Sequence, residues 1–395
     1  MDWNTYLEQL KPQLDSWFEY LHSHAELSFH EVETTAFLTK ILSDIPGMEV
    51  SHPCRTSVIG RLRGNRPGKT VAFRADIDAL PLQEQVDLPW KSIHPGVMHA
   101  CGHDGHATAL LGMAWIFGQM GGDFPGEVRF IFEHGEETSP CGAAELLASG
   151  ALDGIDEIYA AHLDVFLPVG RFHVTEGPVM AAAYTFTIDI HGTGGHAAFP
   201  HQAMDTVYVA SQVISQLHGV VSRCKDPMHR AVLTITQLQG APAPNIIPAD
   251  VHLGGTIRIL DGACIDSFFE AIRRVVTHTC AAYGITGNVD IQLNNALLSN
   301  PPASAAWVRR VLEDQFGQPV LPDAPVMGGE AFGTYSEKIP NSCYFKVGAL
   351  PDDDAEFFPH HHAKFHMNRK ALPVMVEAGA AILLHALQND LEAEK

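Results

Sequence analysis

The sequence predicts an α/β protein with a mostly parallel central sheet, into which a second, α+β domain is inserted. Short continuous apolar runs at residues 71–73, 128–132 and 158–161 are separated by helical stretches, which is typical of strands buried on both faces of a parallel sheet. From about residue 182 the apolar residues instead alternate with polar ones, which indicates half-exposed antiparallel strands. With 395 residues the chain also exceeds what one hydrophobic core usually holds.

The first domain begins and ends with a helix. Its opening helix is predicted by apolar residues spaced three or four apart, namely Trp3, Tyr6, Leu7, Leu10, Leu14, Trp17, Phe18 and Leu21. Helical stretches at 107–120 and 143–148 separate the buried runs, and an apolar helix at 374–387 closes the chain. We assign residues 1–180 and 294–395 to this domain.

The second domain is predicted from residue 181 to residue 293. Alternating strands at 184–190, 251–259 and 289–293 are combined with helical stretches at 203–221 and 264–282. The elements are expected in the order strand, helix, strand, strand, helix, strand, which is the split ferredoxin-like arrangement. Pro301 and Pro302 mark the return to the first domain.

Composition excludes several classes of partner. The 46 acidic and 25 basic residues, a net charge of -21, disfavour nucleic acid and anionic membrane surfaces. No apolar run approaches the length of a membrane span. Seven cysteines without a C-x-x-C pair, and an amino end without a secretory pattern, favour a cytoplasmic protein. The 23 histidines suggest metal binding or proton transfer.

The densest group of reactive side chains is the segment M-H-A-C-G-H-D-G-H at 98–106. Thiolate and imidazole are preferred ligands of zinc and related ions, and glycines let the backbone converge on an ion. The alternative interpretation is helix capping by Asp104 with histidines at the surface.

Further candidates follow the predicted strands. Glu136 and Glu137 follow the run at 128–132, and His162 ends the run at 158–161. Ligands bind at the carboxyl ends of strands in open sheets, where paired acids can divide the roles of metal ligand and general base. Asp76 and Asp78 also stand at a strand end, where they would orient a metal ligand or pair with Arg74. Surface acids and a hydrogen-bonded histidine are the alternatives.

Two regions extend this set. Three consecutive histidines at 360–362 could supply another ligand or form a solvated loop. In the inserted domain, Gly195 and His196 lie in a glycine-rich stretch that would let an imidazole approach a developing oxyanion, or that simply forms a turn. Arg258 could clamp a substrate carboxylate or pair with a local acid.

Taken in order, these motifs resemble the aminoacylase-type family of metal-dependent amidohydrolases and carboxypeptidases. Hippurate hydrolases, auxin-conjugate hydrolases and N-acetyldiaminopimelate deacetylases belong to that family. The matching segments are R-A-D-I-D-A-L-P at 74–81, M-H-A-C-G-H-D-G-H at 98–106, G-E-E at 135–137, A-H-L at 161–163, G-T-G-G-H-A-A-F-P-H at 192–201 and G-G-E-A-F at 328–332. One departure is Ala331, where family members commonly carry an acid.

The resemblance implies a di-metal catalytic domain and an inserted dimerisation or lid domain. It implies metal ligands at Cys101, His103, Glu137, His162 and His361. His361 is selected because the family places this ligand four residues before an aromatic, which is Phe365 here, and His360 and His362 remain alternatives. Glu136 would be the general base, and Asp76 and Asp78 would support the ligands from behind. His196 would bind the oxyanion across a dimer, with Gly195 beside it, while Arg258 or Asn245 would hold the substrate carboxylate.

The expected activity is hydrolysis of the amide bond of N-acyl amino acids or related small amides. Two divalent ions per subunit are expected, zinc or manganese first, with cobalt and nickel as further candidates. A homodimer or homotetramer is expected. The main rival is a dipeptidase or aminopeptidase on the same scaffold. A non-catalytic metal-binding relative is disfavoured by the presence of both Glu136 and Glu137, since a storage site needs no base.

Overall fold

The computed structural model describes residues 3–241, 243–352 and 356–388, and the chain divides into two compact units. Unit 1 comprises Met1–Gly177, Ser299–Ala324 and Thr334–Lys395, and unit 2 comprises Pro178–Leu298 and Pro325–Gly333. Residues 325–333, which the sequence pattern grouped with the first domain, therefore cluster with unit 2. The physical reason is local pairing, because the backbone N–H of Ala181 donates to the carbonyl of Gly328 and Met180 bridges to Val326.

Unit 1 is built on a seven-stranded sheet of order β1-β2-β4-β3-β5-β15-β6. Its four central strands run parallel and are β4 (Pro125–Glu133), β3 (Arg66–Asp76), β5 (Glu157–Asp164) and β15 (Asn341–Gly348). The outer strands β1 (Glu49–Ser51), β2 (Val58–Arg63) and β6 (Phe172–His173) pair antiparallel. A separate two-stranded ribbon joins β7 (Gly177–Met180) to β14 (Leu298–Asn300). The predicted mostly parallel central sheet is confirmed.

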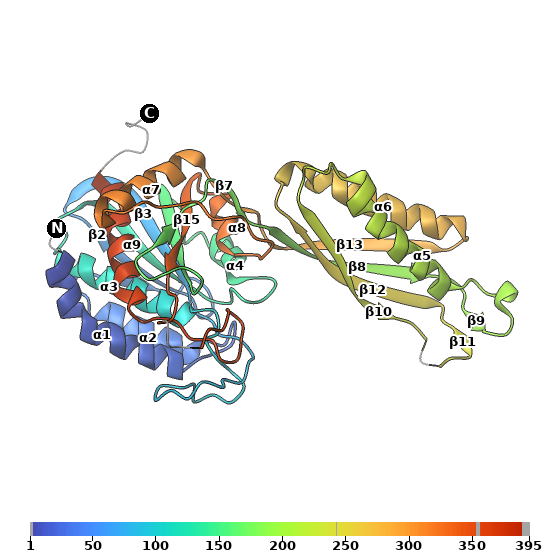
Figure 1. Ribbon diagram of the computed structural model, residues 1–395, viewed down its shortest axis with the longest axis horizontal. Helices are drawn as coiled ribbons and strands as arrows, with labels where there is room; N and C mark the ends of the chain where they lie inside the picture. Colours follow the sequence, from blue (N-terminus) through green and yellow to red (C-terminus); the bar gives the residue numbers. More distant parts are fainter. Residues whose placement is uncertain (1–2, 242, 353–355, 389–395) are drawn as a thin grey trace. The chain divides into compact units, whose positions relative to one another are not determined.

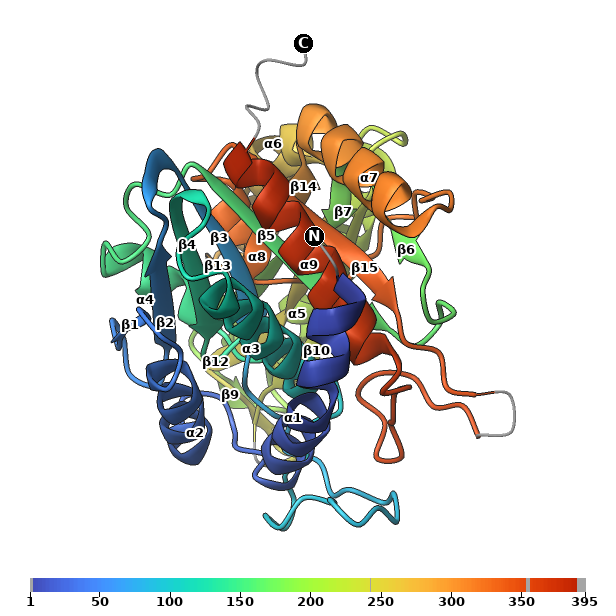
Figure 2. The same ribbon diagram turned by 90° about the vertical axis from the view of Figure 1, so that its left-hand side faces the viewer.

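Helices α1 (Trp3–Ser23), α3 (His103–Gln119) and α9 (Ala371–Gln388) lie together on one face of this sheet (Figure 2). The other helices of unit 1 are α2 (Val32–Ser43), α4 (Gly142–Ala148) and α7 (Pro302–Phe316). The short helix α8 (Phe332–Ser336) begins in the stretch 325–333 that clusters with unit 2. By length and composition α9 could cross a membrane, but 67% of its residues are buried inside the protein. Since it packs against α3 and the central strands, its apolar surface on all sides is that of a core helix.

Unit 2 is a four-stranded antiparallel sheet of order β10-β12-β8-β13 with two helices (Figure 1). Its strands are β8 (Ala182–His191), β10 (Ala231–Gln239), β12 (Asp250–Ile259) and β13 (Thr286–Asn295), and its helices are α5 (Thr206–Gly219) and α6 (Ile265–Ala282). Short helical turns occur at Pro200–Gln202, Val220–Cys224 and Gly262–Cys264. Alternate residues of β8, such as Phe186 and Ile188, join α5 and α6 in one core.

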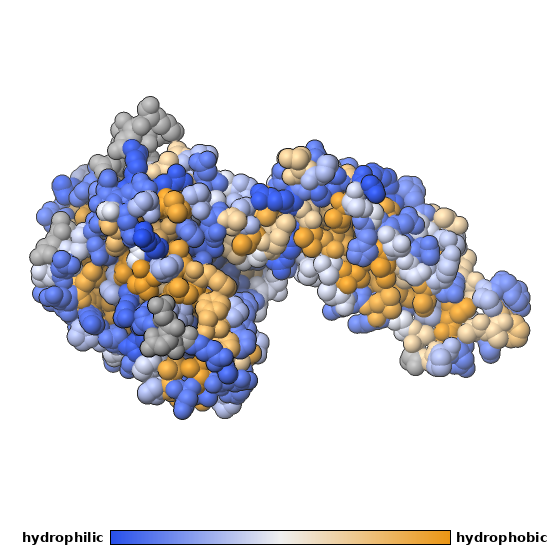
Figure 3. Space-filling view, in the orientation of Figure 1, coloured by the Kyte–Doolittle hydropathy of each residue, from blue (hydrophilic) through white to orange (hydrophobic). Residues whose placement is uncertain are grey.

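A two-stranded ribbon at the end of unit 2 pairs β9 (Gly195–His196) with β11 (Ile246–Ile247). Apolar side chains are exposed in and beside this ribbon, including Phe199, Tyr208 and Ile246. Figure 3 shows apolar residues gathered along the same unit between hydrophilic ones. Exposed apolar groups that lie together are typical of surfaces that another molecule covers.

Candidate metal centre

The parallel strands of unit 1 bring three chemically active segments to one edge of the sheet. Asp76 ends β3, Glu133 ends β4 and His162 lies near the end of β5. Because β3 is paired in parallel with both β4 and β5, these strand ends are neighbours. The segment that carries Glu136 and Glu137 continues directly from β4 and therefore starts from the same edge.

The segment at 98–102 supplies the next residues from the start of α3. Gly102 precedes the helix with φ of 90°, a left-handed conformation that favours glycine. This turn separates Cys101 from His103, the first residue of the helix, and the ligand atoms of both residues belong to one compact group.

The five predicted metal ligands lie together in unit 1. The ligand atoms of Cys101, His103 and His162 lie within 4.8 Å of one another, and so do those of Cys101, Glu137 and His361. Cys101 is therefore common to both groups, with its Sγ 3.5 Å from His162 Nε2. Glu137 Oε1 lies 3.3 Å from His361 Nε2 and 3.9 Å from His103 Nε2. Glu136 joins His103 and Glu137 in a further group of the same size.

Hydrogen bonds leave the Nε2 atoms of the histidines available. His103 donates from Nδ1 to the Asp78 carbonyl at 3.0 Å, and His162 donates from Nδ1 to the Leu163 carbonyl at 2.9 Å. Nε2 of both rings therefore faces the other ligand atoms, with His162 Nε2 toward the Cys101 thiol and His103 Nε2 toward Glu137, which is the orientation of a metal-ligating imidazole. Two imidazoles, a thiol and a carboxylate converging in this way form a donor set that suits divalent metal ions.

The three consecutive histidines differ in what their rings contact. His360 donates from Nε2 to the Leu163 carbonyl at 3.0 Å, and His362 accepts at Nδ1 from the Lys364 N–H. His361 has φ of 64° and its backbone N–H donates to the Ala100 carbonyl. Within the described part of the chain, His361 is the one of the three that belongs to a compact group of ligand atoms.

Asp78 connects two of the predicted ligands. It holds His103, and its Oδ2 accepts from the Glu137 backbone N–H at 2.9 Å and from the Ser28 hydroxyl at 2.7 Å. Burial by itself would raise the pKa of Asp78, but these hydrogen bonds and the nearby His103 charge lower that pKa below its ordinary value. Asp78 is therefore an anionic support for both residues.

His106 has no nitrogen free for a metal, although it belongs to the dense histidine segment. Its Nδ1 donates to Asp76 Oδ1 at 2.6 Å, and its Nε2 accepts from the Leu163 N–H at 3.0 Å. Asp76 also pairs with Arg74, and Arg74 donates from Nε to Glu133 Oε2 at 2.6 Å. Asp76, as a support behind the ligands, and its pairing with Arg74 were expected from the sequence, whereas the contacts of His106 and Glu133 in this buried network were not. An arginine inside an apolar strand was the available signal.

The electrostatics of the group favour a bound cation. Burial raises the pKa of the Cys101 thiol well above its ordinary value, although the His103 charge opposes this. Burial, together with His106 and His360, holds the pKa of His162 well below its ordinary value, so this ring is neutral. A neutral imidazole is ready to bind a metal, whereas a thiolate in so buried a position requires a positive charge beside it.

The predicted substrate-binding residues of unit 2 fall into two separate places. Gly195, His196 and Asn245 lie together at the ribbon, where the Ala197 N–H donates to the Asn245 carbonyl and His196 is exposed. Arg258 lies near the carboxyl end of β12. Asp250 begins that strand, three residues after the ribbon strand β11. Asp250 and Arg258 are eight residues apart on this strand, which at 3.3 Å each is about 26 Å.

A second buried charged group lies behind the segment at 98–106. His22 contacts Asp104 Oδ2 through Nδ1 at 2.7 Å and Glu84 Oε1 through Nε2 at 3.2 Å. Burial by itself would lower the pKa of His22, but these two acids raise it from 6.5 to about 9. His22 is not among the candidate site residues expected from the sequence. Its partners are 82 and 62 residues away, so periodicity carried no signal of this contact.

Replacing His22 by Gln is expected to cost most stability at low pH. A pKa raised from 6.5 to about 9 on folding contributes roughly 3 kcal/mol below pH 6.5, and this contribution is lost as the pH rises through 9. The difference in free energy of unfolding between wild type and His22→Gln should therefore shrink by roughly 3 kcal/mol between about pH 6 and about pH 10 in urea denaturation. His385→Gln, at an exposed position of α9, is the control. A difference that stays constant with pH would show that His22 is not ionised.

Comparisons with known proteins agree with this geometry. Residues 72–387 match the model of peptidase family M20/M25/M40. An N-acyl-L-amino acid amidohydrolase of Geobacillus stearothermophilus is 42% identical over 70% of this chain and 75% of its own length. An N-acetylcysteine deacetylase of Bacillus subtilis is 36% identical over 93% of this chain and 95% of its own length.

Solved structures show the same fold. A crystal structure of a putative aminohydrolase from methicillin-resistant Staphylococcus aureus has a TM-score of 0.92 at 30% identity and covers 97% of this chain and 98% of its own. The Bacillus subtilis YxeP protein, described as a dinuclear metal-binding peptidase, has a TM-score of 0.85 at 31% identity and covers 97% and 99%. The family resemblance predicted from the motifs is thus confirmed, and the chain belongs to peptidase family M20/M25/M40.

Proposed function

We propose that this protein hydrolyses the amide bond of N-acyl amino acids and releases a carboxylic acid and an amino acid. The observation that carries the proposal is the convergence of Cys101, His103, Glu137, His162 and His361 beside the carboxylate of Glu136. Relatives named N-acyl-L-amino acid amidohydrolase and N-acetylcysteine deacetylase support this substrate class. A converging metal-ligand set with an additional acid beside it is what metal-assisted hydrolysis requires.

The five converging residues would hold two divalent ions, and Cys101 belongs to both groups of ligand atoms that these five residues form. Thiolate and imidazole favour zinc, while the carboxylate also suits manganese, and cobalt or nickel are further candidates. When bound, such ions lower the pKa of a coordinated water from 15.7 towards about 7. Asp78 would keep His103 and Glu137 in place, because it contacts both of them.

Glu136 would carry the proton in this reaction. Its carboxylate would accept a proton from the attacking water and then deliver it to the nitrogen of the leaving amine. Its neighbour Glu137 is held by Asp78 and lies beside two imidazoles, which suits a ligand, whereas Glu136 belongs to one compact ligand group and Glu137 to two. The two adjacent acids would thus divide the roles of ligand and base.

We propose that His196 and Asn245 act on the substrate of a second copy of the chain. The ribbon that carries them precedes β12, and Arg258 lies about 26 Å along that strand from its first residue, Asp250, so we infer that His196 and Arg258 of one chain do not act on the same small substrate. Arg258 would hold the substrate carboxylate, and His196 would stabilise the oxyanion of the partner's substrate. The exposed apolar residues near the ribbon support a homodimer. Wild-type kcat in a His196→Ala protein would contradict this role.

Removing the metal is expected to abolish hydrolysis, and adding it back should restore it. The reason is that a water molecule near its ordinary pKa of 15.7 is a poor nucleophile at neutral pH. The measurement is release of amino acid from N-acetyl and N-benzoyl amino acids after chelation, and again after addition of zinc, manganese, cobalt or nickel. A dipeptide with a free amino group is assayed under the same conditions for comparison. Full activity without bound metal would refute the mechanism, and faster cleavage of the dipeptide would favour a peptidase.

A further inference from the structure

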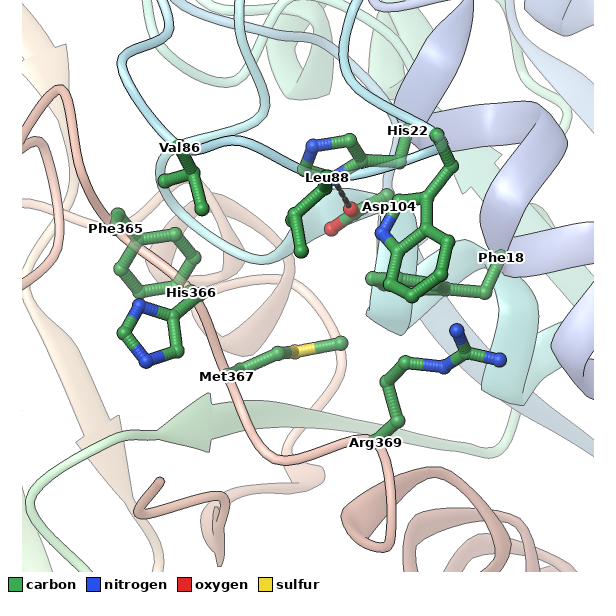
Figure 4. Close-up of a pocket in the computed structure, with 10 residues that line it drawn as sticks. Phe18, His22, Val86, Leu88, Asp104, Phe365, His366, Met367 and Arg369 are labelled. Carbon is green, nitrogen blue, oxygen red and sulfur yellow. Dashed lines mark hydrogen bonds and ion pairs between the residues drawn. The ribbon is translucent and has the colours of Figure 1, made fainter. Parts of the chain in front are cut away.

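Unit 1 contains a cavity of about 250 Å³ that none of the five predicted ligands lines. Its apolar walls come from three parts of the chain, namely α1, the segment after Glu84 and the segment after His361. The apolar lining residues are Phe18, Val86, Leu88, Trp90, Phe365 and Met367. Figure 4 shows Leu88 and Met367 on opposite sides of the cavity, with Phe365 at one end and Phe18 at the other.

Charged groups in the wall are already paired with other protein groups. His22 uses both ring nitrogens for Asp104 and Glu84. The second oxygen of Asp104 accepts the Gly105 N–H at 2.8 Å. An ionic ligand would have to break one of these buried contacts, which is costly because it leaves a buried charge unpaired. This part of the wall therefore favours a neutral ligand.

Arg369, the remaining charged residue that lines the cavity, is also paired with acidic side chains. Its guanidinium is hydrogen-bonded to Glu19 and Asp15. It also lies over the rings of Trp90 and Phe18, 4.5 and 5.4 Å from their centroids. These contacts neutralise the arginine and fix the two aromatic side chains that line the cavity.

The His366 ring offers a ligand an acceptor nitrogen. His366 donates from Nδ1 to the Lys364 carbonyl at 3.2 Å, which leaves its Nε2 as an acceptor. The wall residues Val86, Leu88 and Trp90 are only half-buried, so a ligand can enter from solvent. An apolar cavity of ~150 Å³ holds benzene. The larger cavity here therefore suits a bicyclic aromatic molecule with one hydrogen-bond donor.

The cavity adjoins the backbone that carries the metal ligands. Phe365 packs with Met98 and Ala100, directly before Cys101. Met367 lies against Gly105 so closely that a Cβ there would come within 2.4 Å of its Cε. The cavity thus lies beside the segments that bear Cys101, His103 and His361. The side chains that line it are different residues.

We propose that this cavity is a binding site for a small, uncharged aromatic molecule, separate from the substrate site. The probe is indole, which is neutral, bicyclic and carries one N–H donor. Calorimetric titration of the full-length protein should show one indole per chain with a Kd on the order of 1 mM, as expected of so small a ligand. Benzyl alcohol should bind to the same site better than benzylammonium, because the wall offers no free acid.

Leu88→Trp, which fills the cavity, is expected to weaken indole binding at least about tenfold. Ile93→Trp is the matched control, because Ile93 lies on the same segment, is 60% exposed and does not line the cavity. Circular dichroism checks that each variant folds, and Val86→Phe is the second filling variant.

Equal binding of indole to wild type and to both filling variants would refute the site. So would purely competitive inhibition by indole against an N-acyl amino acid, because it would place indole at the substrate site. Saturating indole should instead leave KM unchanged. The binding measurements need no turnover, so they remain decisive even if the proposed hydrolase activity is wrong.

Discussion

Glu136→Gln is expected to reduce kcat by about 10² to 10⁴-fold while both metal ions remain bound. The amide has nearly the same size as the carboxylate, but it cannot accept a proton from the attacking water. Glu136 contributes to one compact group with His103 and Glu137, whereas the two groups that contain Cys101 do not include it. Metal content by elemental analysis and kcat on an N-acyl amino acid measure the two effects separately.

The matched control for this variant is Glu176→Gln, because Glu176 is an exposed acid of unit 1 that belongs to no ligand group. It should keep the kcat of wild type. If Glu136→Gln retains wild-type turnover, another group is the base. If it loses metal together with activity, Glu136 is a ligand, and the division of roles with Glu137 is wrong.

Cys101→Ala is expected to lose metal and to lower hydrolysis to the level of the chelated protein. Cys101 is common to the group with His103 and His162 and the group with Glu137 and His361, so its removal weakens both of these groups at once. Mutating a residue that hydrogen-bonds to a metal ligand typically lowers metal affinity by 10 to 100-fold. Removing Cys101, a ligand itself, should therefore lower metal affinity by more than roughly 100-fold. Titration with zinc and manganese, followed by a kcat measurement, tests this expectation.

Cys224→Ala is the control for the loss of a thiol, because Cys224 is an exposed free cysteine of unit 2. Its metal affinity and turnover should match those of wild type. Two tightly bound ions in Cys101→Ala would show that the thiolate is not a shared ligand. Circular dichroism must show a folded chain in either case.

Parts of the fold were predictable because local patterns report burial directly. The runs at 71–73, 128–132 and 158–161 lie within β3, β4 and β5, since a strand buried on both faces leaves a continuous apolar signature. The apolar helix near the end of the chain became α9 for the same reason. Residues 325–333 were grouped differently because their place depends on pairing with residue 180 and its neighbours, which no local pattern reports.

The candidate site shows the same division between local and distant information. Asp76, Glu137 and His162 could be expected to meet, because parallel neighbouring strands end at one edge of the sheet. The density of histidines at 98–106 could not separate His103 from His106. The distinction lies in what each Nε2 contacts, since His106 Nε2 accepts from the Leu163 backbone N–H, whereas His103 Nε2 faces Glu137 among the predicted ligands.

The sequence by itself determined the family, and it predicted the types of ligand and base and the edge of the sheet where these residues gather. Short motifs and residues at strand ends indicate these properties. Such local patterns can be recognised without knowledge of the tertiary structure. Only the tertiary structure decided how the imidazole nitrogens are hydrogen-bonded, that His22 lies between two distant acids, and that Arg258 lies about 26 Å along β12 from Asp250, the residue nearest in sequence to the ribbon. The cavity beside Leu88 is also a feature that only the tertiary structure decided. Each of these depends on atoms brought together from segments far apart in the chain, and packing alone sets their distance and orientation.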